Sequence, residues 1–160
     1  MKIGIISDTH NNIEMTRKAV ELFKSRKVDI VIHVGDFTRP EMIDLFDGLL
    51  CRFVLGNCDM DVEKINEKAQ HMGFGNVKES CDIKIDNKRF FVMHGNDAIR
   101  IKKAIASGDY DYVIKGHTHS FENYISNNTR IINPGAINDA KEHSMAILET
   151  KDDSVEKITI

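Results

Sequence analysis

Apolar runs alternate with short polar clusters along this chain, and five of the clusters come directly after a run with the length of a β-strand. Continuous runs such as Lys2–Ile6 are typical of strands that are buried on both faces. The five strands predicted in this way are Ile3–Ser7, Asp29–Val34, Arg52–Leu55, Arg89–Met93 and Tyr112–Lys115. The polar clusters that follow them are Asp8–His10, Gly35–Asp36, Gly56–Asp59, His94–Gly95 and Gly116–His119.

Helical patterns separate the first three strands. Residues 13–25 place Met15, Ala19, Leu22 and Phe23 on one face at helical spacing, and Asn12 is a suitable N-cap. Thr38 and Glu41 have the spacing of a capping box, with a proline in the first turn, and predict a short helix ending near residue 48. This alternation of strand and helix predicts parallel strands with crossover helices.

The second half of the chain is richer in strands. Helices are predicted over residues 61–72, ended by Gly73, and over residues 97–106, capped by Asn96 and ended by Gly108. The pattern predicts further strands at 77–79, 83–85, 121–126, 130–133, 144–150 and 155–160. Asn127-Asn128 is typical of a hairpin turn. No linker or repeat interrupts the pattern, so we expect one α/β domain over residues 1–160, with two packed sheets and helices outside.

Composition places few limits on function. Apolar residues make up 41% and charged residues 29% of the chain, which is ordinary for a globular protein. The net charge of −3 gives no electrostatic footprint for duplex nucleic acid. Three cysteines, an odd number without metal-type spacing, favour a reducing compartment. No apolar run approaches the roughly 20 residues of a membrane span, and Met1–Ile6 does not look like a cleavable leader, so we expect a cytoplasmic protein without membrane contact.

The polar clusters supply a set of metal ligands. Strand tips that lie side by side in a sheet bring their following residues to one edge. In an extended segment, residues two apart point to the same side, as Asp8 and His10 would, and also His117 and His119. The converging candidates are Asp8, His10, Asp36, Asn57, His94, His117 and His119. Oxygen and nitrogen ligands that include two carboxylates suit a pair of divalent cations better than one, which indicates metal-assisted hydrolysis.

Taken singly, each candidate also has an ordinary explanation. Asp8 could cap a helix, Asn57 could belong to a turn, and His94 could be a structural histidine. His33 fits either a supporting role behind the ligands or a place in the core. We expect the remaining histidines, His71 and His143, to be surface residues, and Arg39 to be a minor candidate for a substrate phosphate.

The order Asp-x-His, Gly-Asp, Gly-Asn-x-Asp, His-Gly and Gly-His-x-His resembles that of the calcineurin-like metallophosphoesterases. The small size and Asn133-Pro134-Gly135 resemble the compact phosphodiesterase branch of that superfamily, which also contains the retromer scaffold subunit. The resemblance implies a four-layer α/β sandwich of two mixed β-sheets flanked by helices, with a dinuclear metal site at the strand ends. It implies that one cation is held by Asp8, His10 and His119, that Asp36 bridges, and that the other cation is held by Asn57, His94 and His117. Manganese is the first expectation, with nickel, iron, cobalt and zinc as alternatives.

The function that we expect is hydrolysis of small phosphate diesters by attack of a metal-bound hydroxide. The catalytic candidates are Asp36, Asn57, Cys58 and Asp59. The resemblance implies that much of the superfamily carries, at the position of Cys58, a histidine that protonates the leaving oxygen and is oriented by the aspartate. A thiol is a poor general acid, so we expect a preference for good leaving groups. The sequence leaves two alternative functions: a phosphomonoesterase or nucleotide phosphatase, and a non-catalytic protein-binding scaffold. It also leaves a homo-oligomeric assembly possible.

Overall fold

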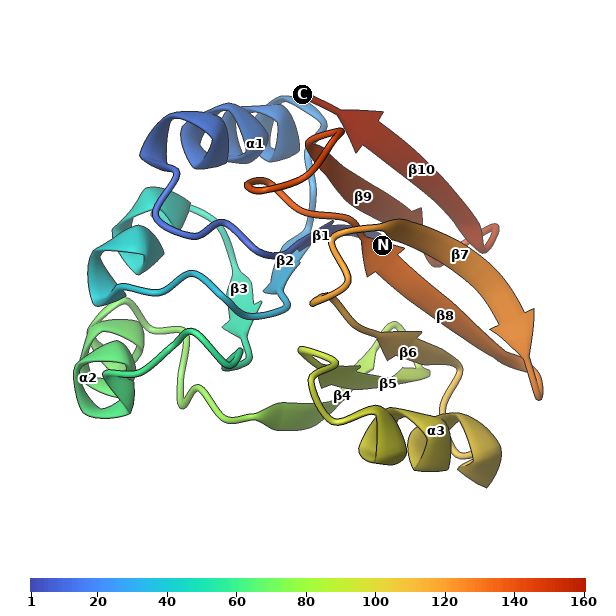
Figure 1. Ribbon diagram of the computed structural model, residues 1–160. Coiled ribbons are helices and arrows are strands. Elements are labelled where there is room, and N and C mark those ends of the chain that lie inside the picture. The colour runs from blue at the N-terminus through green and yellow to red at the C-terminus, as the bar shows by residue number, and fades with distance from the viewer.

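Two five-stranded β-sheets pack face to face in the computed structural model, which describes all 160 residues (Figure 1). The first sheet has the order β10-β9-β1-β2-β3 and the second the order β4-β5-β6-β8-β7. Helix α1, the 3-10 helix η1 and helix α2 pack on the outer face of the first sheet, and α3 packs on the second. The four-layer α/β sandwich expected from the sequence is confirmed.

The elements lie close to the predicted ranges. The helices are α1 (Ile13–Ser25), η1 (Pro40–Phe46), α2 (Val62–His71) and α3 (Ala98–Ser107). The strands of the first sheet are β1 (Lys2–Ile6), β2 (Ile30–His33), β3 (Cys51–Phe53), β9 (Ser144–Glu149) and β10 (Ser154–Thr159). Those of the second are β4 (Ser80–Ile85), β5 (Lys88–Met93), β6 (Tyr112–Ile114), β7 (Phe121–Ser126) and β8 (Thr129–Pro134). None of the helices has the length and apolar character needed to cross a membrane.

Both sheets are mixed. In the first, β1, β2 and β3 are parallel, with Ile6 opposite His33, while β9 runs antiparallel to β1. In the second, β5, β6 and β8 are parallel, and β4 and β7 are antiparallel edge strands. The β7–β8 hairpin turns at Asn127 and Asn128, both left-handed (φ 49° and 63°), as the sequence predicted. Parallel neighbours bring the ends of β1 and β2, and of β5 and β6, to the same edge.

The core fills the spaces between the layers. One cluster, which includes Ile3, Ile5 and Phe90, lies between the two sheets. Gly4 faces α1, where a Cβ atom would come within 2.7 Å of the Phe23 ring. A glycine at this position therefore lets α1 lie close against β1.

Three local predictions were wrong. The capping box does not form, because Thr38 has a φ of 75° and its N–H donates to Asp59. Asp97, not Asn96, caps α3, and accepts hydrogen bonds from two backbone N–H groups. Residues 77–79 form no strand and contribute only an isolated bridge from Lys78 to Val54. At Thr38 the carboxylate of Asp59 takes the N–H that Glu41 would accept in a capping box. At α3 a carboxylate, a better acceptor than the amide of Asn96, takes the backbone N–H groups.

Candidate metal centre

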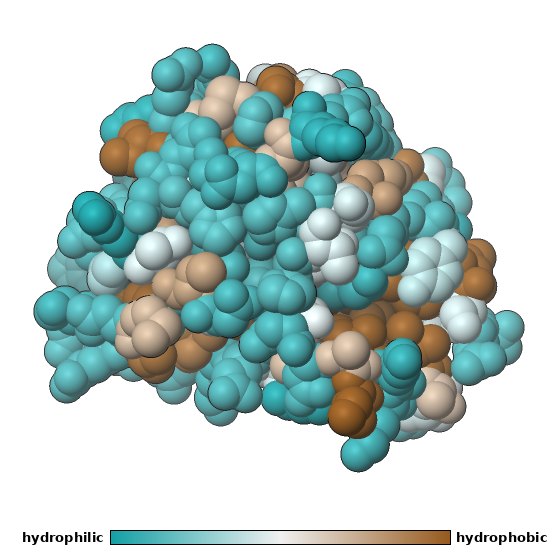
Figure 2. All heavy atoms as spheres, viewed as in Figure 1, coloured by the Kyte–Doolittle hydropathy of each residue, from teal (hydrophilic) through white to brown (hydrophobic).

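The loops that follow β1, β2, β5 and β6 are joined by hydrogen bonds. The backbone N–H of Asp8 donates to the carbonyl of Gly35 (3.1 Å), and that of Gly116 donates to the carbonyl of His94 (2.8 Å). The two sheets are connected where the N–H of His117 donates to Asp8 Oδ2 (3.2 Å). In Figure 1 these loops meet near the centre of the view, and Figure 2 shows mainly hydrophilic side chains there.

Five of the seven predicted ligands lie within a few ångströms of one another. Asp8 Oδ1 is 3.1 Å from His119 Nε2, and Asp36 Oδ2 is 3.3 Å from His94 Nε2. His10 Nε2 lies between the two carboxylates, 3.8 Å from an oxygen of each. Three overlapping sets of residues have ligand atoms that all lie within 4.8 Å of one another. They are Asp8 with His10 and His119, Asp8 with Asp36 and His94, and His10 with Asp36 and Cys58.

Several of these atoms are buried without a hydrogen-bond partner. They are Asp8 Oδ1, His10 Nε2 and His94 Nε2. A buried polar atom without a partner costs on the order of 1–3 kcal/mol, and more when it is charged. Lone pairs on carboxylate and imidazole that converge in this way fit divalent cations, which would satisfy all of them. The residues present therefore fit the metal centre that the sequence predicts.

Backbone carbonyls fix two of the imidazole rings. His94 Nδ1 lies 2.7 Å from the carbonyl oxygen of Val34, and His119 Nδ1 lies 3.0 Å from that of Asp139. A carbonyl only accepts, so each Nδ1 carries the proton and donates. The Nε2 lone pair of each ring is then directed at the carboxylates, as a metal ligand requires. The sequence alone does not identify these two carbonyls.

Asn57 and His117 lie outside the three ligand sets. His117 is exposed, and its ring stands edge-on to that of His94 with the centroids 5.1 Å apart. Asn57 is exposed, and its Nδ2 lies 3.4 Å from Cys58 Sγ. Both therefore border the cluster, and their coordination of a cation stays a prediction.

Asp36 is held as a carboxylate. Its Oδ1 accepts a hydrogen bond from the backbone N–H of Cys58 (2.8 Å), which leaves Oδ2 facing the histidines. Burial opposes ionisation, but the neighbouring His94 ring and the backbone N–H of Cys58 hold the pKa of Asp36 well below its usual range. The charged form is the one that binds cations.

Asp59 connects two loops. It is 4% exposed and accepts three backbone hydrogen bonds, from Asp36 (2.9 Å), Gly56 (2.7 Å) and Thr38 (2.6 Å). Burial raises the pKa of this carboxyl group, and the three donors oppose that rise. Since both of its oxygens are used on the backbone, these contacts favour a positioning role for Asp59 over a direct catalytic one.

Cys58 lies beside the ligands as a thiol. Burial first, and then the neighbouring Asp36 carboxylate, raises its pKa to about 11. The thiol therefore keeps its proton near neutral pH and is a weak acid toward a leaving oxygen.

The ligand loops have a strained backbone. Asp8, His10, Asp36, His117 and His119 all have positive φ values, between 39° and 68°. The assumption of an extended Asp8–His10 segment was therefore wrong, because a turn, not strand alternation, brings the two side chains together. Strain of roughly 1–3 kcal/mol per residue persists only where the surroundings fix the conformation, and such residues cluster at functional sites.

His33 supports the ligand loops from within the core. It is fully buried, and its Nδ1 accepts the N–H of Gly35 (3.2 Å), so Nε2 carries the proton and donates to Thr9 Oγ1 (3.1 Å). Its ring also stacks on Phe53. Both roles expected of His33 are therefore met by one side chain, which braces the residues beside Asp8 and Asp36.

We expect His33 to make the protein less stable in acid. Burial lowers its pKa to about 3, whereas the unfolded chain titrates near 6.5. The unfolded state therefore binds the extra proton, and stability that is present above about pH 6.5 is lost toward pH 3 by up to about 1.4 kcal/mol per pH unit. Urea unfolding of metal-free wild type and His33→Gln at several pH values measures this. The advantage of the wild type should shrink as the pH falls, and a constant difference would contradict the prediction.

The other candidates are not members of the three ligand sets. His71 ends α2 and is exposed, as predicted. His143 is not simply solvated, because its Nδ1 donates to the Ile137 carbonyl (2.8 Å). Arg39 is exposed at the N-terminus of η1.

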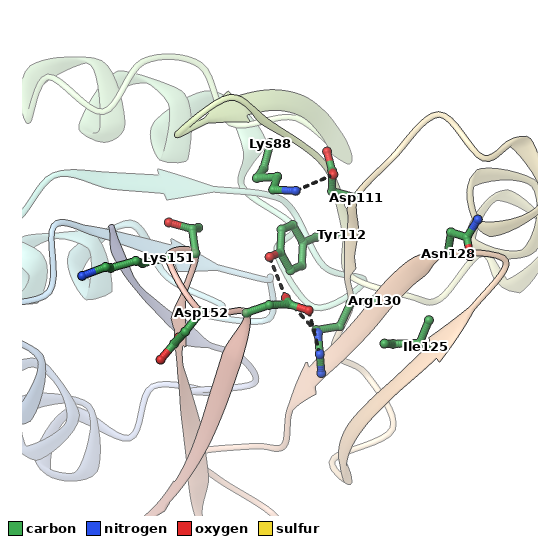
Figure 3. Close-up of a pocket in the computed structure, with 10 residues that line it drawn as sticks. Lys88, Asp111, Tyr112, Ile125, Asn128, Arg130, Lys151 and Asp152 are labelled. Carbon is green, nitrogen blue, oxygen red and sulfur yellow. Dashed lines mark hydrogen bonds and ion pairs between the residues drawn. The ribbon is translucent and has the colours of Figure 1, made fainter.

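A polar pocket of about 460 Å³ lies where β5 and β6 begin, at the opposite ends of these strands (Figure 3). Four of its charged side chains form pairs: Lys88 with Asp111 (3.1 Å), and Arg130 with Asp153 (2.8 Å). The hydroxyl of Tyr112 also donates to Asp153 (2.7 Å). None of the unpartnered buried atoms lies in this pocket, so its contacts connect the β9–β10 hairpin to the second sheet.

The fold and the converging ligands define a metallophosphoesterase, and comparison with known families agrees. Residues 1–153 match the calcineurin-like phosphoesterase superfamily domain, and the chain belongs to that family. It is 38% identical over 138 residues to phosphodiesterase MJ0936 of Methanocaldococcus jannaschii, covering 84% of this chain and 83% of the relative.

Solved structures show the same fold. An archaeal phosphodiesterase superposes with a TM-score of 0.95 at 33% identity, over 100% of both chains. Vps29 of Entamoeba histolytica superposes with a TM-score of 0.72 at 19% identity, covering 100% of this chain and 99% of that one. The second likeness, at this low identity, concerns the fold alone.

Proposed function

We propose that this protein is a phosphodiesterase that uses two divalent cations. The observation that carries the proposal is the convergence of the buried, unpartnered atoms Asp8 Oδ1, His10 Nε2 and His94 Nε2 at one edge of the sandwich. Asp8, His10 and His119 would hold one cation, and Asp36 would bridge. His94, Asn57 and His117 would hold the other.

When bound by these residues, two cations would supply positive charge for the phosphoryl oxygens and would lower the pKa of coordinated water. The protein's own part is to fix the ligands. Val34 and Asp139 orient the imidazoles, and Asp59 holds the loops on either side of Asp36. Manganese is the first choice of metal, and nickel, iron, cobalt and zinc also suit this mixture of ligands.

Metal reconstitution tests the proposal. The stripped protein is loaded with each metal in turn and assayed on bis(4-nitrophenyl) phosphate and on 4-nitrophenyl phosphate. We expect the diester to be hydrolysed faster by the loaded protein and neither ester by the stripped protein. Faster hydrolysis of the monoester would favour the phosphomonoesterase alternative, and inactivity on every ester with full metal occupancy would favour a scaffold.

We predict that Cys58→His improves catalysis on poor leaving groups. An imidazole with a pKa near neutrality is a better general acid than a thiol whose pKa is about 11. Along a series of aryl diesters of rising leaving-group pKa, the gain in kcat/KM should grow from none to about tenfold. Cys58→Ser is the control and should leave the slope of the series unchanged. If Cys58→His leaves rates unchanged across the whole series, leaving-group protonation is not what limits this site.

The scaffold alternative is weakened by the complete ligand set. Every predicted carboxylate, amide and imidazole is present, and three of the residues that brace them, His33, Val34 and Asp59, are buried. A site that had lost its catalytic function would not need strained ligand loops. The proposal also treats residues 1–160 as one domain and places the protein in the cytoplasm, in accord with its three free cysteines.

A further inference from the structure

A small pocket adjoins the metal centre on the side of β3 and α3. Its volume is about 340 Å³, and Leu55, Asn57, Met93, Asn96, Asp97 and Arg100 line it together with Glu79. Asn57 is a proposed metal ligand, and Met93 directly precedes His94. The pocket therefore opens beside the phosphate position that the proposed function requires.

Arg100 has donors to spare in this pocket. One of its terminal nitrogens donates to Ser80 Oγ (2.6 Å) and the other to Glu79 Oε2 (3.3 Å). A guanidinium has five N–H donors, so these contacts fix its plane and leave further donors free. Arg100 is thus an oriented group with unused hydrogen bonds.

Asn96 is also free to bind a ligand. It is exposed and has no hydrogen-bond partner for its amide, because Asp97 has taken the capping role at α3. Asp97 uses only Oδ1 for the two backbone N–H groups, at 3.1 and 3.0 Å. The pocket therefore offers an amide and a carboxylate oxygen beside the guanidinium.

This mixture of groups indicates the kind of ligand. Two carboxylates, Glu79 and Asp97, outnumber the single cation Arg100, which disfavours a second anionic group. Hydroxyl groups both donate and accept hydrogen bonds, and so suit neighbouring carboxylates, amides and guanidinium. The apolar side chains of Leu55 and Met93 can contact ring carbons. The volume lies at the small end for ligand pockets and suits a sugar, not a whole nucleotide.

We propose that this pocket binds one arm of the phosphodiester substrate, and that this arm is a sugar or another polyol. The inference rests on the proposed function, since it places the phosphate on the metal centre. A second pocket of about 540 Å³, which His119 helps to line, leaves room for the other arm. Asn96 and Arg100 are the residues that select the hydroxylated arm.

A binding measurement tests the pocket. Manganese-loaded protein is titrated calorimetrically with uridine 5′-monophosphate and with its 2′,3′-dideoxy analogue, which lacks both sugar hydroxyls. We expect the analogue to bind at least about tenfold more weakly, because sites that bind a hydroxyl reject ligands without it. Equal affinities, or no binding of either nucleotide, would overturn the proposal.

Matched variants locate the effect. Asn96→Ala and Arg100→Met should bring the ratio of the two affinities close to one, while Asn76→Ala and Arg89→Met, which lie outside the pocket, should keep the wild-type ratio. The exposed Asn96 has no side-chain hydrogen bond to lose, so its variant should fold as the wild type does. A ratio that persists in both pocket variants would refute the assignment. Hydrolysis of bis(4-nitrophenyl) phosphate, measured in parallel, reports on the proposed function separately from the affinity ratio.

Discussion

Replacing Asp36 by asparagine is expected to lower kcat/KM on bis(4-nitrophenyl) phosphate by about 10³-fold or more, since a bridging carboxylate contributes several kcal/mol through the cations it holds. In the wild type the backbone N–H of Cys58 donates to Asp36 Oδ1 (2.8 Å), and the amide oxygen of an asparagine can still accept this hydrogen bond. The amide nitrogen would then replace Oδ2, which faces His94 Nε2 at 3.3 Å. This nitrogen has no lone pair for a cation, so the bridge is lost while the fold is kept.

Metal content and activity together check this prediction. Elemental analysis of the loaded variant should show less bound metal per chain than the wild type, and circular dichroism should be unchanged. Asp44→Asn is the matched control, because this exposed carboxylate only pairs with Lys68 at the surface. An Asp36→Asn protein with full metal content and wild-type turnover would contradict the bridging role.

Gly56→Ala is expected to disrupt the centre without changing any ligand. A Cβ atom at Gly56 would lie 2.1 Å from Asp36 Oδ1 and 2.5 Å from the Asp36 backbone nitrogen. The loops after β2 and β3 would have to separate, which also breaks contacts that Asp59 makes to both. We expect a loss of stability of about 3 kcal/mol and, because a displacement of about 1 Å misplaces the ligands, a loss of about 10²-fold in kcat/KM.

Urea unfolding and kinetics on the same samples measure both effects. Gly75→Ala is the control, since nothing lies within 4 Å of its Cβ position and only its φ of 78° is strained. That strain costs roughly 1–2 kcal/mol and should leave kcat/KM unchanged. Wild-type activity in Gly56→Ala would show that the close approach of these loops is not required.

The hydrophobic pattern of the sequence was sufficient to predict the layers of this fold. Helix α1 begins and ends where its periodicity and the Asn12 cap placed it, because its free energy comes from local capping and one apolar face. Hairpin β7–β8 was predictable for a similar reason, since adjacent asparagines tolerate the left-handed turn. Two of the predictions that failed, at Thr38 and Asn96, are those in which another carboxylate, Asp59 or Asp97, accepts the backbone N–H groups.

By itself, the sequence determined which residue types follow which strands, and hence that carboxylates and imidazoles meet at one edge. Only the tertiary structure decided how they meet. The turn at Asp8 and His10, the carbonyls of Val34 and Asp139 behind the rings, and the hold of Asp59 on two loops depend on segments far apart in the chain. Backbone carbonyls and left-handed conformations leave no trace in residue identity, because every residue carries a carbonyl and strain is sustained only by its surroundings.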